Sequence, residues 1–286
     1  MRRVRAIAIA SVALLVLGVL SLRWVLYERT QHSGFTVRAN GPERPSDVGL
    51  RYDEFWIASG ERRLQAWWVP ADSTGPDSGA VLIFHGNNES LSQWVAAVDL
   101  LHRHHLSCMV FDYSGYGSST GTPSVDRLLE DGAAALIEFE RRAAGAPRRC
   151  AVGLSLGTAV AMGVVSRSWA ALDGVALLEP FASGREAAVY LKLVPPWLAP
   201  LMPDAFNNVE GARRLRAPLL IVHSRADQRF PVAQAERIRA AATAPAKLVV
   251  LDGYPHAAAY RDPSEGYWAP VVALVQRGLA AVDGGS

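Results

Sequence analysis

The sequence predicts an α/β fold, built on a mostly parallel sheet that is covered by helices on both faces. From residue 80 onward, short uninterrupted apolar runs alternate with helical patterns. Runs of this kind are typical of strands buried on both faces, and their alternation with helices is typical of a parallel sheet. The chain has 286 residues, half of them hydrophobic, which suits one large domain of about 250 residues after an N-terminal segment.

The first elements in chain order are a basic tail, residues 1–5, and a transmembrane anchor, residues 6–27. Residues 6–22 carry no charge, and with Arg23 snorkelling to the interface the run reaches about 22 residues, enough to span a bilayer. A cleaved signal peptide is the alternative, but residues 19–24 are bulky where a cleavage site needs small ones. Trp24 and Tyr27 suit an interfacial anchor. The arginines before the run favour a cytoplasmic N-terminus and place the rest outside, on the periplasmic side of a bacterial inner membrane.

A polar segment, residues 28–47, is expected to be a tether to a domain that spans residues 48–286. The domain should begin with a hairpin of residues 50–57 and 63–69, joined by turn residues 59–61. Further strands are predicted at 80–84, 108–111, 150–152, 174–178, 219–222 and 248–251. Helices are predicted at 91–101, at 126–142 with Ser124 as N-cap, directly after Gly157, and at 268–280.

Composition excludes several kinds of partner and cofactor. Lys and Arg (29) nearly balance Asp and Glu (27), without a basic stripe, so no nucleic-acid partner is expected. Cys108 and Cys150 each lie in a predicted buried strand, and two cysteines do not make a disulfide framework. No His and Cys spacing resembles a metal site, and no cofactor is predicted.

The strongest motif is Gly-x-Ser-x-Gly at residues 153–157, between a predicted strand and a predicted helix. A serine on such a sharp turn is exposed above the sheet, and its neighbours must be small so that strand and helix can approach. This context predicts that Ser155 is a nucleophile.

A serine nucleophile needs a base and an acid that orients the base. Functional residues of parallel sheets follow the carboxyl ends of strands, and Asp227 and His256 both do so, in the order Ser, Asp, His. Glu179, after the 174–178 strand, is the alternative acid. His223 is expected to be a packing residue at a strand end, because it is too close to Asp227 in sequence for that acid to orient it.

An oxyanion hole needs two N–H donors, one from the residue after the nucleophile and one from a loop after an earlier strand. Leu156 supplies the first. The second is expected from Asn87, with Gly86 allowing close approach and His85 holding the loop.

The chain resembles the α/β-hydrolases, in particular the small-lid, often membrane-anchored serine hydrolases that include eukaryotic protein depalmitoylases. The resemblance covers residues 48–280, with Ser114 where Arg is common and Ser224 where Gly is common. It implies that the strand of residues 80–84 separates the two cysteine strands, by about 10 Å in all, too far for a disulfide. The matching stretches are residues 67–70, 85–87, 112–121, 153–157, 179–181 and 217–218, with Asp227 and His256.

Residues 182–212 are longer than a plain connection and match the position of that family's lid. Two interpretations stay open: an apolar cover for an acyl group that dips into the membrane surface, or a small helical subdomain packed on the sheet. Tyr190, Trp197 and Leu198 are the candidate substrate contacts in the lid.

Together these features predict a serine hydrolase that cleaves an ester or thioester of an apolar acyl substrate near the membrane. The first alternative is an aminopeptidase-like peptidase, for which Asp204 or Glu210 would hold a substrate amine. The second is a non-catalytic binding protein that keeps the fold.

Overall fold

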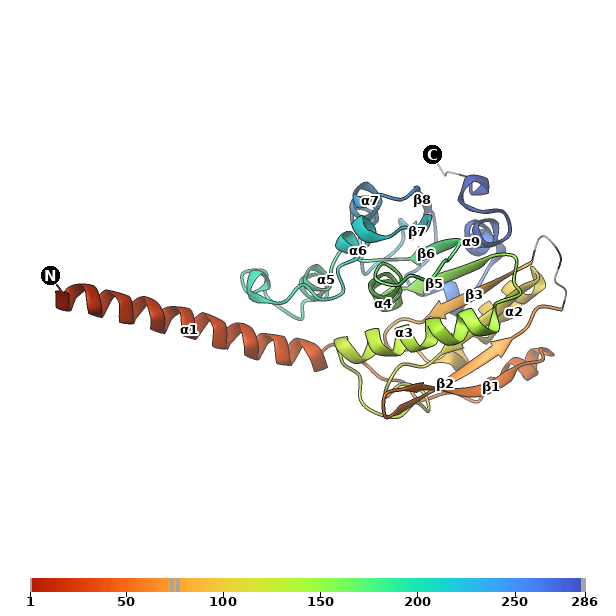
Figure 1. Ribbon diagram of the computed structural model, residues 1–286. Helices are drawn as coiled ribbons and strands as arrows, with labels where there is room; N and C mark the ends of the chain where they lie inside the picture. Colours follow the sequence, from red (N-terminus) through yellow and green to blue (C-terminus); the bar gives the residue numbers. More distant parts are fainter. Residues whose placement is uncertain (1, 73–74, 76–77, 284–286) are drawn as a thin grey trace.

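The computed structural model describes residues 2–72, 75 and 78–283 (Figure 1). Met1 of the predicted basic tail and residues 284–286 of the predicted domain lie outside the described residues. One sheet has the strand order β1-β2-β4-β3-β5-β6-β7-β8, in which β2 is antiparallel to both neighbours and the other pairs are parallel. The strands are β1 (Asp53–Ser59), β2 (Arg62–Val69), β3 (Gly79–Phe84), β4 (Leu106–Phe111), β5 (Arg149–Leu154), β6 (Gly174–Leu178), β7 (Leu219–Ser224) and β8 (Ala246–Leu251).

Both faces of this sheet are covered, as the uninterrupted apolar runs predicted. Every residue of β3 is buried, and successive side chains enter opposite layers: Leu82 lies in one core cluster and Ile83 in the other. The predicted fold class is therefore confirmed. One face carries α3 (Val125–Arg142), α4 (Leu156–Val165), α6 (Asn208–Arg214) and α7 (Val232–Ala241); the other carries η2 (Leu91–Trp94), α2 (Val95–Arg103), α8 (Ala258–Arg261), α9 (Glu265–Arg277) and η4 (Leu279–Ala281).

Several local predictions are confirmed in detail. The predicted hairpin forms, but its first strand runs from Asp53 to Ser59 rather than over 50–57, so Ser59, expected in the turn, pairs with Arg62. The Ser124 hydroxyl caps α3 as predicted, by accepting from the Arg127 N–H at 3.1 Å. Strand β3 lies between the two cysteine strands, with Val81 paired to both Cys108 and Cys150. Both thiols are free and buried, and burial raises the pKa of each.

Helix α1 (Arg2–His32) extends from the domain as an isolated rod (Figure 1). Its Ile9–His32 portion has a mean hydropathy of 2.2, and the most apolar window is not buried at all, so by length and composition it is a candidate membrane span or signal sequence. The helix continues five residues beyond the predicted boundary at 27. At its end the Gln31 side chain accepts from the Asp126 N–H at 3.2 Å, which ties this last turn to α3.

Residues 33–44, expected to be a tether, instead lie along the domain. The carbonyl of Thr36 accepts from the Asn88 N–H at 2.9 Å, and that of Arg38 from the Gly117 N–H at 2.8 Å. Composition alone suggested a solvated linker, but the backbone groups of this segment find partners on two loops of the domain. A short helix, η1 (Pro45–Val48), then leads to β1.

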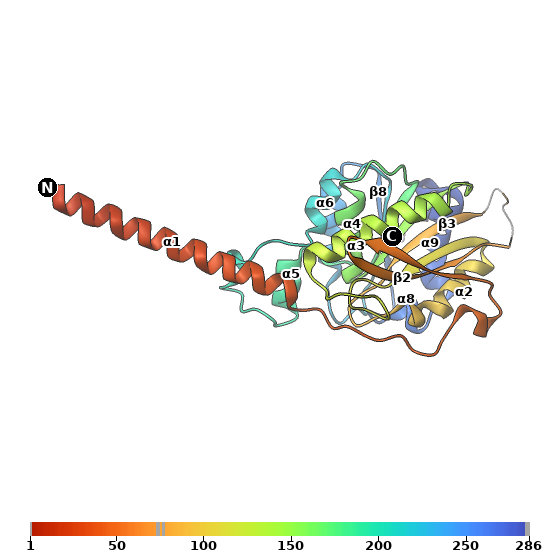
Figure 2. The same cartoon turned by 60° about the horizontal axis from the view of Figure 1, so that its bottom comes forward.

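The predicted lid contains α5 (Gly184–Tyr190) and η3 (Ala199–Leu201). Its last residues, 208–212, belong to α6, where Gly211 lies against the Met162 side chain of α4. This end of the segment is part of the helical cover of the sheet rather than of the lid. The protruding part lies on the same side of the domain as the end of α1 in both views (Figures 1 and 2).

Candidate active site

Ser155 occupies a strained turn between β5 and α4. Its backbone angles are φ 50° and ψ −113°, a region that non-glycine residues rarely adopt. The turn is fixed by two hydrogen bonds, from the Ser155 N–H to the Leu178 carbonyl (3.0 Å) and from the Thr158 hydroxyl to the Ser155 carbonyl (2.6 Å). The serine side chain is thereby held above the end of the sheet.

Close backbone packing explains the glycine at position 157. A Cβ atom placed there would fall far inside contact distance of the Phe84 carbonyl oxygen at the end of β3. The absence of a side chain lets α4 begin directly beside the loop that follows β3. The small-residue requirement that identified the motif therefore has a direct structural cause.

His256 joins Ser155 to Asp227 in one hydrogen-bonded chain. His256 Nε2 lies 2.8 Å from Ser155 Oγ, and Nδ1 lies 2.8 Å from Asp227 Oδ2. An ionised carboxylate only accepts, so Nδ1 carries the proton and Nε2 accepts from the serine hydroxyl. The structure thus brings together the three side chains that the sequence singled out from three strand ends.

The loop after β7 keeps Asp227 charged although its side chain is fully buried. Burial by itself raises the pKa of this carboxyl, but the hydrogen bond and charge of His256 and the N–H groups of Arg229 (2.7 Å) and Phe230 (3.2 Å) outweigh it, so the net pKa is lowered. His223 contacts the same loop, with Nε2 at 3.0 Å from the Phe230 carbonyl, and burial lowers its pKa. It takes the packing position expected of it.

Glu179, the alternative acid, lies behind Asp227 and makes no hydrogen bond to His256. Its side chain accepts from the Ser224 N–H at 3.1 Å and from the Tyr267 hydroxyl at 3.2 Å, and it is completely buried. Burial raises the pKa of Glu179 to about 9, and the neighbouring charge of Asp227 adds to the rise. The two acids therefore differ in the direction of their shift: the pKa of Asp227 is lowered, and that of Glu179 is raised.

We expect Glu179→Gln to remove a pH dependence of stability. The folded-state pKa (about 9) lies above the ordinary 4.5, so the folded protein retains a proton that the unfolded chain releases. This contribution is fully present below about pH 4.5 and is lost as pH rises through 9. The free energy of unfolding of wild type minus that of the variant should fall by up to about 1.4 kcal/mol per pH unit in this window.

Denaturant unfolding of both proteins at pH 5, 7 and 8.5 measures this difference. Glu89, whose pKa burial raises to about 7, is present in both proteins and cancels. A difference that stays constant with pH would contradict the neutral state of Glu179.

The loop after β3 brings Asn87 beside the serine. The Asn87 side chain is held by three hydrogen bonds: its oxygen accepts from the Thr36 N–H (2.8 Å) and the Tyr116 hydroxyl (2.7 Å), and its amide donates to the Gly34 carbonyl (2.7 Å). The N–H of Leu156 is the first of α4 and has no acceptor within that helix. His85 is buried in the loop, with Nδ1 at 2.8 Å from the Gly86 carbonyl, as expected for a residue that holds it.

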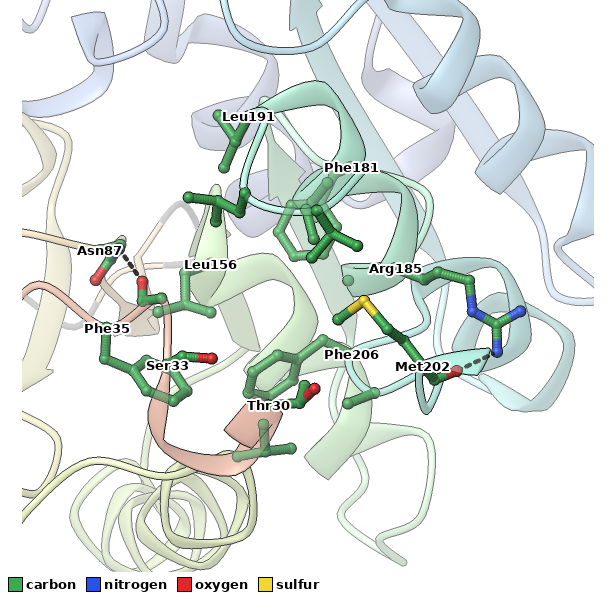
Figure 3. A pocket seen from close by; sticks show the side chains of 18 of the residues that line it. Thr30, Ser33, Phe35, Asn87, Leu156, Phe181, Arg185, Leu191, Met202 and Phe206 are labelled. Carbon is green, nitrogen blue, oxygen red and sulfur yellow. Dashed lines mark hydrogen bonds between the residues drawn. The ribbon is translucent and has the colours of Figure 1, made fainter. Parts of the chain in front are cut away.

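A cavity of about 330 Å³ opens beside Ser155, Leu156 and Asn87. Figure 3 shows that residues from two distant segments of the chain surround it, among them Thr30 and Phe35 from the N-terminal segment and Leu191 and Met202 from the lid. Phe35 meets Phe206 edge-on at 6.4 Å between ring centroids. Sequence reasoning missed the Thr30–Phe35 part of the wall; its one signal was an isolated phenylalanine in an otherwise polar stretch.

None of the three lid residues predicted to contact substrate lines this cavity. Ala187, Ala188 and Leu191 face it from α5 and the residue after it. Tyr190 is rotated away from these positions on the helix and is 52% exposed, and Trp197 is 76% exposed. Leu198, next to Trp197, is also absent from the lining. The cavity face of the lid is thus shifted from the predicted residues to their neighbours.

Glu179, His223 and Asp227 place three potential metal ligands within 4.8 Å of one another. Each already has a partner, namely Tyr267, the Phe230 carbonyl and His256 respectively. This cluster is better described as the support behind the Asp227–His256 pair than as a metal centre.

Comparison with known proteins finds a matching family model and relatives that align over most of the chain. A model of the alpha/beta hydrolase fold matches residues 79–215. The chain is 34% identical over 260 residues to the uncharacterized protein Rv2307c of Mycobacterium tuberculosis, covering 90% of each chain. It is 30% identical over 215 residues to the uncharacterized protein YfhR of Escherichia coli, covering 73% of this chain and 74% of that one.

Solved structures with the same architecture include esterase Pf2001 of Pyrococcus furiosus, with a TM-score of 0.70, 19% identity, and coverage of 86% of this chain and 99% of that chain. The acylaminoacyl peptidase of Pyrococcus horikoshii aligns with a TM-score of 0.63 and 14% identity, over 83% of this chain and 43% of that chain. At these identities the likeness shows the fold alone.

Proposed function

The chain belongs to the α/β-hydrolase family, and from this premise we propose that it is a serine hydrolase that cleaves carboxylic ester or thioester bonds through an acyl-enzyme. The observation that carries the proposal is the chain of two 2.8 Å contacts from Ser155 through His256 to Asp227. The strained serine turn and the cavity beside it support the same conclusion.

In the proposed reaction Ser155 Oγ attacks the substrate carbonyl carbon while His256 Nε2 takes the hydroxyl proton. Asp227 holds the Nδ1–H tautomer and stabilises the imidazolium. The tetrahedral intermediate collapses, its bond to the leaving oxygen or sulfur breaks, and His256 returns the proton to that atom. Water then attacks the acyl-serine with His256 as base, which releases the acid and restores the hydroxyl.

The negative oxygen of each intermediate requires donors already in place. We assign this role to the N–H groups of Leu156 and Asn87, two residues that line the same cavity as Ser155. A preorganised donor of this kind is typically worth about 3 kcal/mol of transition-state stabilisation. The three hydrogen bonds to the Asn87 side chain fix the loop that carries the second donor.

The lining of the cavity favours an apolar acyl group. Its walls are mainly aliphatic and aromatic, and the charged residues among them are Arg185 and Arg229. Arg185 donates a hydrogen bond to the Met202 carbonyl (2.8 Å; Figure 3). Of the two interpretations of the lid, this lining supports an apolar cover for an acyl group over a helical subdomain that only packs on the sheet.

The aminopeptidase-like alternative needs an acid facing the substrate amine. Asp204 bonds to Asn207 (2.6 Å), and Glu210 pairs with Arg213 (3.0 Å) and Arg214 (2.7 Å); neither acid lines the cavity beside Ser155. We therefore prefer an ester or thioester to a substrate with a free amine. Because one of the solved structures with this fold is a peptidase, the experiment below also includes peptidase substrates.

We further propose that α1 is an uncleaved membrane anchor, with its N-terminus in the cytoplasm and the hydrolase domain outside. The bulky residues at positions 19–24, where a cleavage site needs small ones, support an anchor over a cleaved signal, and the exposed apolar helix Ile9–His32 is long enough to span a bilayer. A reporter fused after Ser286 checks the orientation. Activity of a reporter that works only in the cytoplasm would overturn it.

The function is tested with a fluorophosphonate probe and three substrate series: p-nitrophenyl esters of increasing chain length, matched acyl thioesters, and aminoacyl p-nitroanilides. We expect probe labelling on Ser155, turnover of esters and thioesters, and no turnover of anilides. Anilide turnover above ester turnover would favour the peptidase. Turnover of none, with no labelling, would favour the non-catalytic binding protein.

A further inference from the structure

Four large apolar side chains of the lid are exposed to solvent instead of being buried in the core. Tyr190, Leu191, Leu193 and Trp197, which we call the lid surface, are 52%, 39%, 61% and 76% exposed. Leu191 and Leu193 also contribute to the cavity wall, so the surface is continuous with the mouth of the cavity. Clustered exposure of this kind marks a contact with another apolar phase.

The lid surface lies next to the helix proposed to cross the membrane. Figures 1 and 2 both place α5 beside the end of α1, and the cavity is lined by Thr30 and Ser33 from that end and by Leu191 and Leu193 from the lid. Six residues separate Tyr27, the predicted interfacial anchor, from Ser33, which is about 9 Å along a helix. The headgroup layer of a bilayer is of similar depth, about 5–8 Å.

The chemistry of the lid matches a membrane interface. Trp and Tyr are the side chains most enriched at headgroup level, because each combines an apolar ring with a polar atom. No acidic residue occurs between Glu186 and Asp204, and Lys192 in the middle of the lid surface is exposed and cationic. Such a segment suits an interface that contains anionic lipid.

We propose that the lid surface lies in the headgroup layer of the bilayer that holds α1, and that the cavity takes its acyl chain from a substrate resident in that leaflet. This inference rests on the proposed hydrolase function and anchor. It explains why Tyr190 and Trp197 are exposed although neither lines the cavity. It also narrows the proposed substrates to acyl esters or thioesters embedded in a membrane.

The test uses the full chain in nanodiscs containing anionic lipid. Trp197→Glu and Tyr190→Glu place a carboxylate on the lid surface without touching the cavity. Trp169→Glu is the matched control, since Trp169 is 88% exposed but lies between α4 and β6 beneath Arg216 (4.4 Å). Each protein is assayed on water-soluble p-nitrophenyl acetate and on a fluorogenic long-chain ester lipid within the nanodisc.

We expect the two lid variants to lose about tenfold in kcat/KM on the bilayer ester and to keep the wild-type rate on the acetate, and the control to keep both rates. Equal loss on both substrates would indicate a structural role and would overturn the proposal, as would no loss on the bilayer ester.

A second measurement does not depend on activity. Trp197→Cys and Trp169→Cys are labelled with a fluorophore in nanodiscs that contain lipid carrying a shallow spin-label quencher; Cys108 and Cys150 are buried and should not react. Quenching is expected at 197 and not at 169, and equal quenching would contradict the membrane contact. Quenching at 197 in a protein without hydrolase activity would overturn the proposed function and leave the membrane contact in place.

Discussion

Ser155→Ala is expected to lower kcat by about 10⁴- to 10⁶-fold, with little change in KM or in stability. Only the hydroxyl group is removed, and among the described residues its hydrogen-bond partner is His256 Nε2 at 2.8 Å. The cavity lining and the oxyanion donors would be unchanged. Substrate should still bind, but no acyl-enzyme can form.

The measurement is p-nitrophenyl ester turnover together with fluorophosphonate labelling followed by peptide mapping. Ser166→Ala is the matched control, because Ser166 lies at the C-cap of α4, the helix that begins after Ser155. The control should keep wild-type turnover and labelling. Turnover retained by Ser155→Ala, or labelling mapped elsewhere, would show that another residue is the nucleophile.

Gly157→Ala should have the largest effect on folding. The added methyl group would overlap the Phe84 carbonyl oxygen, and the obstacle is backbone on β3 rather than the end of a flexible side chain. Relief requires α4 to move away from β3, which also separates Leu156 from Asn87. We expect the free energy of unfolding to fall by about 3 kcal/mol or more.

Gly145→Ala provides the comparison, since a Cβ atom there would have no neighbour within 4 Å. It should change the free energy of unfolding by less than about 0.5 kcal/mol. Denaturant midpoints of the two variants measure the difference. If they matched, the close approach at Gly157 would be dispensable and the structural reason for the motif's glycine would be lost.

The sequence was sufficient for the fold class and for the nucleophile and the base, and it placed Asp227 ahead of Glu179 as the acid without deciding between them. Apolar runs such as those of β3 and β5 are typical of strands covered on both faces, so the alternation of runs and helices already indicates the layers. Ser155, Asp227 and His256 could be chosen because the carboxyl ends of parallel strands meet at one edge. These features depend on local periodicity and on chain order, and both can be read directly from the amino-acid sequence.

Only the tertiary structure decided which acid faces His256 and what surrounds the serine. Asp227 and Glu179 both follow strands, and the choice between them depends on loop geometry that delivers two N–H groups to Asp227 and the Tyr267 hydroxyl to Glu179. The wall from Thr30 to Phe35 comes from a segment whose polar composition indicated a linker.

The lid shows the same limit on a smaller scale. Its apolar composition is evident from the sequence, but which side chains line the cavity depends on where the lid lies against it, and this puts Leu191 in the cavity wall and leaves Trp197 outside it. Composition and period reveal that a segment is apolar or helical. They do not reveal its neighbours, because those are set by contacts between residues more than a hundred positions apart, such as His256 and Ser155.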